Sequence, residues 1–354
     1  MKKTFKILQK SKNSRARRGV LYTKHGEIET PAFMPVATYG TVKALPSFFL
    51  DEVRANIVLM NLLHLLFYPS VEIIERAGGV HKYFSINLPV LFDSGGYQTY
   101  SLKGYRKVEE KGVIFKDPRS GKSKLLNPET VVEMEERMGC DIGMVLDLCP
   151  PANCSLKEME KAVDITQKWA LRSLNVWEKE KFSLFGIVQG GTNLALREKA
   201  ARNLRDMDFD GYGIGGLGLG EEEKLTFEAV EAVVENLPED KPRYLMGFGY
   251  PEDIKKAVEL GVDLFDCVIP TRNARNGQIF TSKGIINYKS AKYKEVFKPP
   301  DENCPCLTCK NYTLSYLYTM YHQREIVSYF LATLHNLYFW LDFISNLRQT
   351  ITLI

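Results

Sequence analysis

Eight short apolar segments separated by helix-like stretches are the feature that most constrains how this chain folds. They have the length of buried β-strands, the first and sixth being the weakest, and they run Thr30–Val36, Ala55–Met60, Leu88–Phe92, Ile142–Leu146, Leu184–Val188, Tyr212–Ile214, Tyr244–Met246 and Val262–Phe265. Helix starts recur between them, with Pro128 after Asn127 and a Ser155–Glu158 capping box. Repeated β-then-α units predict an α/β fold, a (β/α)8 TIM barrel, with a doubly wound open sheet as the alternative.

Polar residues and glycines follow these segments where the strands would end. They are Asn61, Asp93, Asp147, Gln189 with Gly190 and Gly191, Gly215 with Gly216, Met246 with Gly247, and Asp266. Each one taken alone is more typical of a helix cap or a turn. In a parallel barrel, however, all strand ends meet at one face, where active sites form. Their coincidence therefore predicts a functional site at that face.

The side chains at this face suit a flat ligand that forms hydrogen bonds. The ionised carboxylates of Asp93 and Asp147 can only accept hydrogen bonds, whereas Gln189 and the Gly215–Gly216 backbone can donate them. Guanine has the complementary edge, with N1–H and an amine beside O6. Tyr97 and Met246 offer apolar surfaces that could sandwich its ring. Asp266 is then left free to attack as a nucleophile.

Asp266 lies in the segment that we expect to carry the chemistry, residues 264–277. An apolar run ends in this carboxylate, and Arg272 and Arg275 follow in a turn-prone stretch that ends at Gly277. This order places a potential nucleophile beside arginines that could bind phosphates or base edges. The alternative is a buried strand followed by a solvated basic loop.

A cluster of cysteines near the C-terminus predicts a metal site. Three thiols and a histidine form a closed tetrahedral set that suits one structural Zn²⁺, from Cys304, Cys306, Cys309 and His335. Seven cysteines in total, an odd number, argue against a disulfide framework and for an intracellular protein. We expect His25, His64, His81 and His322 to be structural, because none has such neighbours in the sequence.

Three regions lie outside the repeating pattern. Residues 103–126 are predicted to form a β-hairpin inserted after the third strand of a barrel that spans residues 1–288, and residues 289–354 a zinc-binding subdomain with closing helices. Residues 1–18 carry eight Lys or Arg and no acid, which suits either an anionic polymer or a solvated strand edge. No apolar run reaches the about 20 residues of a membrane span, so we expect a cytoplasmic protein without a membrane partner.

Several motifs together resemble one enzyme family. Asp93-Ser-Gly-Gly-Tyr-Gln98, Gly186-Ile-Val-Gln-Gly-Gly191, Gly215-Gly-Leu217, the Asp266 segment and the Cys/His cluster are similar to those of the tRNA-guanine transglycosylases, or queuine tRNA-ribosyltransferases, of the bacterial type. The resemblance covers nearly the whole chain. It implies a zinc-bearing (β/α)8 barrel, usually a homodimer, that exchanges guanine at the first anticodon position of certain tRNAs for a 7-deazaguanine.

The resemblance also implies roles for individual residues. Asp266 would be the nucleophile and Asp93 the proton acceptor or donor. The base would be bound by Asp93, Ser94, Gly95, Gly96, Tyr97, Asp147, Gln189, Gly215, Gly216 and Met246. The tRNA would be contacted by Gly247, Phe248, Gly249, Tyr250, Pro251, Glu252, Asp253, Thr271, Arg272, Asn273, Ala274 and Arg275. Two positions depart from the family pattern, the stretch Asn61-Leu-Leu-His64 and Leu148, where a Glu is usual.

The incoming base is predicted to be 7-aminomethyl-7-deazaguanine. Leu219 is bulky where family members that use queuine have glycine, and Glu221 could favour the aminomethyl cation by its charge. Three alternatives remain: queuine as the incoming base, a non-catalytic tRNA-binding subunit on the same fold, and the same exchange on DNA. The aromatic segment from Tyr312 to Trp340 could pack against a second copy of the chain.

Overall fold

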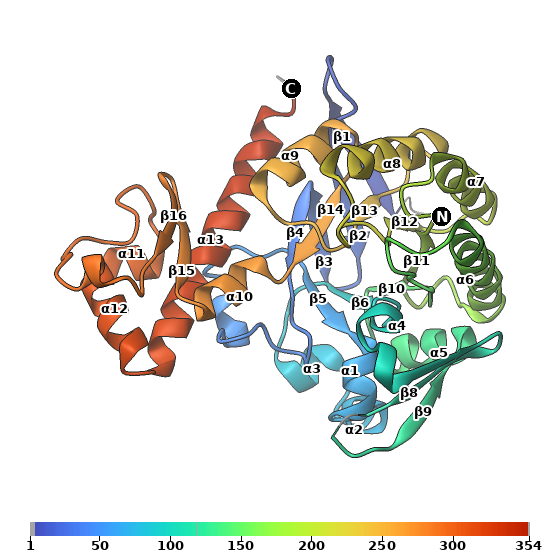
Figure 1. Cartoon of the computed structure of the whole chain (residues 1–354), viewed down its shortest axis with the longest axis horizontal. Helices are drawn as coiled ribbons and strands as arrows, with labels where there is room; N and C mark the ends of the chain where they lie inside the picture. The colour runs from blue at the N-terminus through green and yellow to red at the C-terminus, as the bar shows by residue number, and fades with distance from the viewer. Residues whose placement is uncertain (1–3, 118, 353–354) are drawn as a thin grey trace.

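The core of the protein is a parallel barrel. The computed structural model describes residues 4–117 and 119–352. Its largest sheet has eight parallel strands in the order β4 (Ala32–Pro35), β14 (Leu264–Cys267), β13 (Arg243–Leu245), β12 (Gly211–Ile214), β11 (Ser183–Val188), β10 (Ile142–Met144), β6 (Val90–Asp93) and β5 (Val58–Asn61). A bridge between Val36 and Leu59 links the two outer strands. The predicted barrel is therefore confirmed, and the open-sheet alternative is wrong (Figure 1).

Helices surround the sheet and cover its outer surface (Figure 1). They are α1 (Leu62–Phe67), α2 (Val71–Arg76), α3 (Val80–Phe84), α4 (Gln98–Ser101), α5 (Pro128–Met138), α6 (Leu156–Val176), α7 (Leu194–Asp206), α8 (Glu223–Asn236) and α9 (Pro251–Glu259). The predicted capping box at Ser155 forms, and a second one forms at Asn127, with each side chain accepting from the backbone three residues on. Short 3-10 helices occur at Ser47–Phe49, Lys103–Tyr105 and Ala291–Tyr293.

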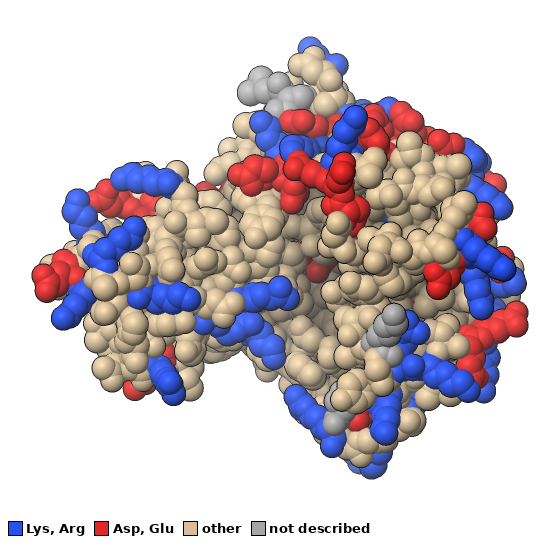
Figure 2. Space-filling model, viewed as in Figure 1, with Lys and Arg blue, Asp and Glu red and all other residues tan. Residues whose placement is uncertain are grey.

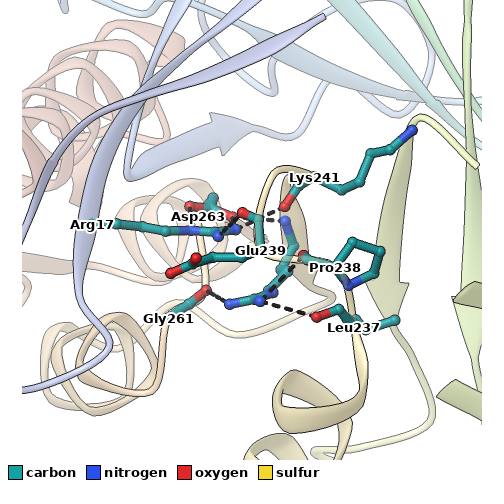
Figure 3. Close-up of polar contacts among 8 residues, drawn as sticks. Arg17, Leu237, Pro238, Glu239, Lys241, Gly261 and Asp263 are labelled. Carbon is teal, nitrogen blue, oxygen red and sulfur yellow. Dashed lines mark hydrogen bonds and ion pairs between the residues drawn. The ribbon is translucent and has the colours of Figure 1, made fainter. Parts of the chain in front are cut away.

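The basic N-terminal arm folds against the barrel instead of remaining free. It forms the antiparallel sheet β1 (Phe5–Lys10), β2 (Arg17–Thr23) and β3 (Gly26–Thr30). Arg17 is buried and donates to both oxygens of Asp263, at 2.9 and 2.6 Å, just before β14 begins (Figure 3). Arg15 pairs with Glu231 and Glu235. These charges are paired at the N-terminal ends of the strands, away from the predicted site, which favours the strand-edge interpretation for the described part of the arm. Lys2 and Lys3 of the predicted basic arm lie outside the described residues.

The insertion after β6 has one strand more than predicted. The expected hairpin is present as β8 (Gly112–Lys116) and β9 (Ser123–Leu126), and β7 (Arg106–Glu109) pairs with the free edge of β8. The exposed, charged sequence of β7 lacks the alternation of apolar and polar residues that would have identified it as a strand. The Asp117 carboxylate closes the turn by accepting from the backbone of Arg119 and Ser120.

The C-terminal region forms a lobe beside the barrel (Figure 1). It contains the hairpin of β15 (Gln278–Thr281) and β16 (Gly284–Asn287), then α11 (Leu307–Asn311), α12 (Leu314–His322) and α13 (Ile326–Thr350). Ile279 of the hairpin packs in an apolar cluster with Leu317 and Leu331, so the lobe includes residues that the sequence analysis assigned to the barrel. Trp340 on α13 donates to the carbonyl of Gly249 at 2.5 Å, which ties the lobe to a loop at the C-terminal ends of the strands.

None of the helices in the described ranges has a stretch both long and apolar enough to cross a bilayer.

Candidate active site

Three carboxylates meet at the C-terminal ends of the strands. Asp93 ends β6, Asp147 follows β10, and Asp266 lies in β14. The three lie close enough that the charges of Asp147 and Asp266 both act on Asp93. Figure 2 shows this face of the molecule hollowed in its centre, with an acidic group visible at the bottom of the hollow. The structure therefore brings together the three acids that the strand pattern predicted would meet.

Asp266 is held through one of its two carboxylate oxygens. The Tyr244 hydroxyl donates to Oδ1 at 2.6 Å, and the Gly247 N–H donates to the same atom at 2.7 Å. None of the described residues donates a hydrogen bond to Oδ2. Burial raises the pKa of Asp266, and the hydrogen bonds from Tyr244 and Gly247 oppose that shift. The carboxylate is thus oriented by Oδ1, which leaves Oδ2 available to attack.

Tyr244 contacts the candidate nucleophile, and the sequence did not predict this contact. It was assigned to a strand only, because an isolated tyrosine within an apolar run is typical of a core residue. The contact forms because β13 and β14 pair with Tyr244 opposite Leu264, from where its hydroxyl reaches Asp266 two residues further along β14. No local sequence signal could have revealed it.

Asp93 is a buried acid whose pKa lies near neutral pH. Burial, and then the charges of Asp147 and Asp266, raise its pKa from the ordinary 3.8 to about 7. Asn61 lies opposite Asp93 in the parallel register of β5 and β6 and donates to its Oδ2 at 2.6 Å. Oδ1 is buried, and no described residue gives it a well-aligned hydrogen bond. This side chain can therefore take up or release a proton in the pH range where enzymes work.

Asp147 and Gln189 form a buried pair at the C-terminal ends of β10 and β11. The amide of Gln189 donates to Asp147 Oδ2 at 2.6 Å, and its own Oε1 is buried without a partner among the described residues. A Cβ on Gly96 would collide with Asp147, and one on Gly216, whose φ is +65°, would collide with Gln189 Oε1. Burial raises the pKa of Asp147 to about 6. The unpartnered Gln189 Oε1 and the Asp147 carboxylate are both acceptors, so they suit a ligand that carries N–H donors.

The two predicted ring-sandwiching residues lie at different depths. Tyr97 is 48% exposed at the mouth, whereas Met246 is half-buried with its sulfur facing Gly213 and Gly215. Burial raises the pKa of Tyr97, and the charge of Arg272 opposes that shift, which indicates that Arg272 lies near this ring. Ser94 and Gly95 are buried in the turn after β6, beneath the mouth.

The predicted RNA-contacting residues divide into exposed and buried groups. The segment after Asp266 is the helix α10 (Ile269–Arg275) and not a loop, because Pro270 suits a first helical turn. Arg272 is exposed on α10, whereas Thr271 and Ala274 face the interior. Gly249 is also buried, so these three residues do not lie on the exposed surface.

Other members of that set remain accessible at the mouth. Gly247, Tyr250 and Glu252 are exposed, and Phe248, Pro251, Asp253, Asn273 and Arg275 are partly so. Arg275 also donates to the carbonyl of Thr271 at 2.8 Å. Lys and Arg gather on the C-terminal lobe and around α10, and Asp and Glu on the opposite rim near α8 and α9 (Figure 2). A polyanion would therefore approach the hollow from the side of α10.

The predicted metal ligands come together at the base of the C-terminal lobe. One potential ligand atom from each of Cys304, Cys306, Cys309 and His335 lies within 4.8 Å of the others. His335 Nε2 is 2.7 Å from the carbonyl of Phe280, an acceptor that requires a proton on this nitrogen. Its Nδ1 therefore presents a lone pair to the sulfurs of Cys309 and Cys306, at 3.2 and 3.5 Å. Three thiols and an oriented imidazole fit a structural zinc.

Two of the histidines predicted to be structural, His25 and His81, have a carboxylate beside them in the fold that the sequence did not show. His25 and His81 stack with ring centroids 3.5 Å apart and an angle of 19°, and both contact Asp141. Asp141 lies just before β10, at the opposite end of the barrel from the three catalytic candidates. Its carboxylate also accepts from the Val90 backbone at 2.9 Å. The nearly parallel rings do not direct their lone pairs at one point, so this cluster is best understood as a link between β2–β3, α3 and the barrel.

Comparisons with known proteins identify the family of the chain. A family model described as queuine tRNA-ribosyltransferase matches residues 11–353. Proteins named queuine tRNA-ribosyltransferase from Thermoanaerobacter pseudethanolicus and Aquifex aeolicus are 45% and 46% identical, over 98% of this chain and 93% and 94% of their own lengths. One from Francisella tularensis subsp. novicida is 44% identical over 96% of this chain and 93% of its own length. The chain belongs to the queuine tRNA-ribosyltransferase family.

Proposed function

We propose that this enzyme, a tRNA-guanine transglycosylase, works through a covalent Asp266–ribose intermediate. The observation that carries the proposal is the Asp266 carboxylate, held by Tyr244 and Gly247 through Oδ1 with Oδ2 left free. A non-catalytic tRNA-binding subunit would have no need of an oriented carboxylate beside a second acid that titrates near pH 7. The enzyme is therefore favoured over the accessory subunit.

The reaction balances as two displacements at the same ribose carbon. Asp266 Oδ2 attacks C1′ while the bond from C1′ to guanine N9 breaks, and N9 takes a proton from Asp93. The incoming base then returns its N9 proton to the Asp93 carboxylate and attacks C1′, which releases Asp266. A group that gives and takes one proton in successive steps needs a pKa near the working pH, and the pKa of about 7 for Asp93 suits this role.

We propose that Asp147, Gln189 and Gly216 recognise the base. Asp147 would accept from N1–H and the exocyclic amine of guanine, and its pKa of about 6 leaves it ionised at neutral pH. The Gln189 side-chain amide and the Gly216 N–H would bind O6. Gln189 is already fixed by its 2.6 Å hydrogen bond to Asp147, so the recognition edge is formed before the base arrives.

We propose 7-aminomethyl-7-deazaguanine as the incoming base, with queuine as the alternative. Leu219 follows the Gly215–Leu217 turn and is partly buried, which restricts the room for a cyclopentenediol. Glu221 supports this choice less than expected, because it accepts from the backbone N–H groups of Gly218 and Leu219 and so is engaged within the loop. The preference therefore rests on the size of Leu219.

The proposed partners are tRNA and a second copy of this chain. The exposed arginines of α10 and the basic surface beside it suit an anticodon stem-loop. Phe48 and Ile326 are 71% and 75% exposed, and the rings of Phe49 and Phe330, close to them in the sequence, have centroids 4.7 Å apart. Exposed apolar side chains such as these suit a homodimer interface. A cytoplasmic location is proposed because that is where tRNA is modified.

The test is base exchange followed by trapping of the intermediate. The unaltered protein should incorporate labelled guanine into bulk tRNA and, with a deazaguanine present, form an RNA adduct that survives a denaturing gel. Asp266→Asn keeps the size of the side chain but removes the attacking charge, so the adduct should disappear. If Asp266→Asn still forms the adduct and Asp93→Asn does not, the roles of the two acids are reversed.

A further inference from the structure

Arg197 is a buried arginine behind the proposed base pocket. It lies in the first turn of α7, and its side chain is 0% exposed. In the described part of the chain no carboxylate forms an ion pair with it, although the charge of Glu221 acts on it from a distance. Burial lowers its pKa to about 10, which leaves it charged at neutral pH. Burying a charged group is energetically unfavourable, so the guanidinium requires hydrogen-bond acceptors around it.

The compensation comes from three backbone carbonyls on two different loops. Nε donates to the carbonyl of Gly191 at 2.7 Å and one terminal nitrogen to that of Val188 at 2.8 Å. The other terminal nitrogen donates to the carbonyl of Gly216 at 3.4 Å. Val188 and Gly191 flank the turn after β11, and Gly216 belongs to the loop after β12. One planar guanidinium therefore links two consecutive strand-to-helix loops.

These two loops carry the residues proposed to bind the base. Gln189 lies between the first two carbonyl contacts, and Gly216 makes the third. The backbone of the intervening Gly190 packs on the arginine, because a Cβ there would be 3.3 Å from its Cγ and Cδ. Gly216 is already so close to Gln189 that a side chain could not be added. The spacing between the two loops thus depends on a side chain that does not itself enter the pocket.

We propose that Arg197 is a positioning residue that sets base affinity by holding Gln189 and Gly216 at the spacing the base requires. This inference rests on the proposed function, and specifically on base recognition by those two residues. The fork of an arginine can satisfy carbonyls in several directions at once, whereas a lysine ammonium acts as a single point donor. Arg197→Lys would therefore keep the charge and lose the link between the loops.

The chain provides a matched control in Arg243. This arginine is also buried, and it also donates to three backbone carbonyls, those of Leu237, Pro238 and Gly261, at 3.2 to 3.3 Å. Its contacts lie at the N-terminal ends of the strands, beside Asp263, and none involves the pocket. Arg243→Lys should therefore lower the melting temperature without changing the affinity for guanine.

The experiment measures labelled guanine exchange into tRNA with each substrate varied in turn. We expect Arg197→Lys to raise the KM for guanine roughly tenfold, because a small displacement of Gln189 and Gly216 weakens their contacts with the base. The KM for tRNA should be unchanged. Hydrogen exchange of the folded variant should accelerate in residues 188–191 and 215–218 and not elsewhere. Arg197→Met, which removes every donor, should move both readouts further in the same direction.

Each other outcome overturns the inference. If Arg197→Lys only loses thermal stability, as Arg243→Lys does, or raises both KM values equally, Arg197 is a general structural residue. The same conclusion follows if neither Arg197 variant folds. Absence of guanine exchange in the unaltered protein would instead refute the proposed function itself, so the two failures are distinguishable.

Discussion

Removing one hydroxyl, in Tyr244→Phe, tests how the nucleophile is held. The Tyr244 hydroxyl lies 2.6 Å from Asp266 Oδ1 and donates to the ionised carboxylate, and a hydrogen bond to a charged group contributes about 1.5–3 kcal/mol. Because this bond stabilises the ionised form, it lowers the pKa of Asp266, and its loss should raise that pKa. The Gly247 N–H remains to bind Oδ1, so the carboxylate should keep its approximate position.

The expected result is a loss of activity that depends on pH. With the pKa of Asp266 raised, a smaller fraction of the nucleophile is ionised at any pH below the new value. The acid limb of kcat should therefore move to higher pH, with a deficit of about ten- to hundredfold at low pH that narrows as the pH rises. The KM for tRNA should be unchanged, because the hydroxyl contacts the protein's own carboxylate and not the surface of the hollow.

The assay is guanine exchange measured from pH 5.5 to 9, with Tyr212→Phe as the control. Tyr212 is also buried, on the neighbouring strand β12, but its electrostatic neighbours are Asp208 and Asp240 and not the three catalytic candidates. Its pH profile should match that of the unaltered protein. A deficit in Tyr244→Phe that is equal at every pH, or one that Tyr212→Phe reproduces, would refute the view that Tyr244 tunes Asp266.

Three further predictions follow from the same contacts. Cys306→Ala should lose the zinc, whose binding contributes about 10–16 kcal/mol in small domains. The C-terminal lobe should then become sensitive to proteolysis while the barrel stays folded. Metal analysis that finds one zinc per chain in the variant would contradict the assignment. Asp93→Asn should gain stability relative to the unaltered protein as the pH rises from 4 to 7 and hold that gain above pH 7. The pKa of Asp93 is raised from 3.8 to about 7 by folding, so ionised Asp93 lowers the free energy of unfolding by up to about 4 kcal/mol. If thermal unfolding shows no gain in stability for Asp93→Asn at pH 7, this prediction is wrong. In competition between the two bases for displacing labelled guanine, the unaltered protein should prefer 7-aminomethyl-7-deazaguanine and Leu219→Gly should shift toward queuine, whereas a preference for queuine in the unaltered protein would show that the steric argument is wrong.

The fold and the composition of the site could be predicted from the sequence because both depend on local, repeated patterns. Each barrel strand is a short apolar run followed by a helix start, and this pattern can be recognised without knowing what the run contacts. Once the runs are counted as parallel strands, topology requires their C-terminal ends to meet, so Asp93, Asp147 and Asp266 could be grouped without coordinates. The metal cluster could be predicted for a similar reason, because three cysteines within six residues must lie close together.

Only the tertiary structure decided which side chains support the site and which surfaces remain free. Tyr244 contacts Asp266 on the neighbouring strand, and Arg197 contacts Gly216 in a different loop. Neither contact produces a periodic pattern in the sequence. Arg17 had the sequence context of a solvated basic arm but is buried against Asp263, 246 positions away. Thr271 and Ala274 were grouped with Arg272 by proximity along the chain, but a helix turns about 100° per residue, which placed them on its buried side. Sequence patterns specify which elements form, whereas the pairing of polar atoms between distant elements is settled by packing, which no local pattern encodes.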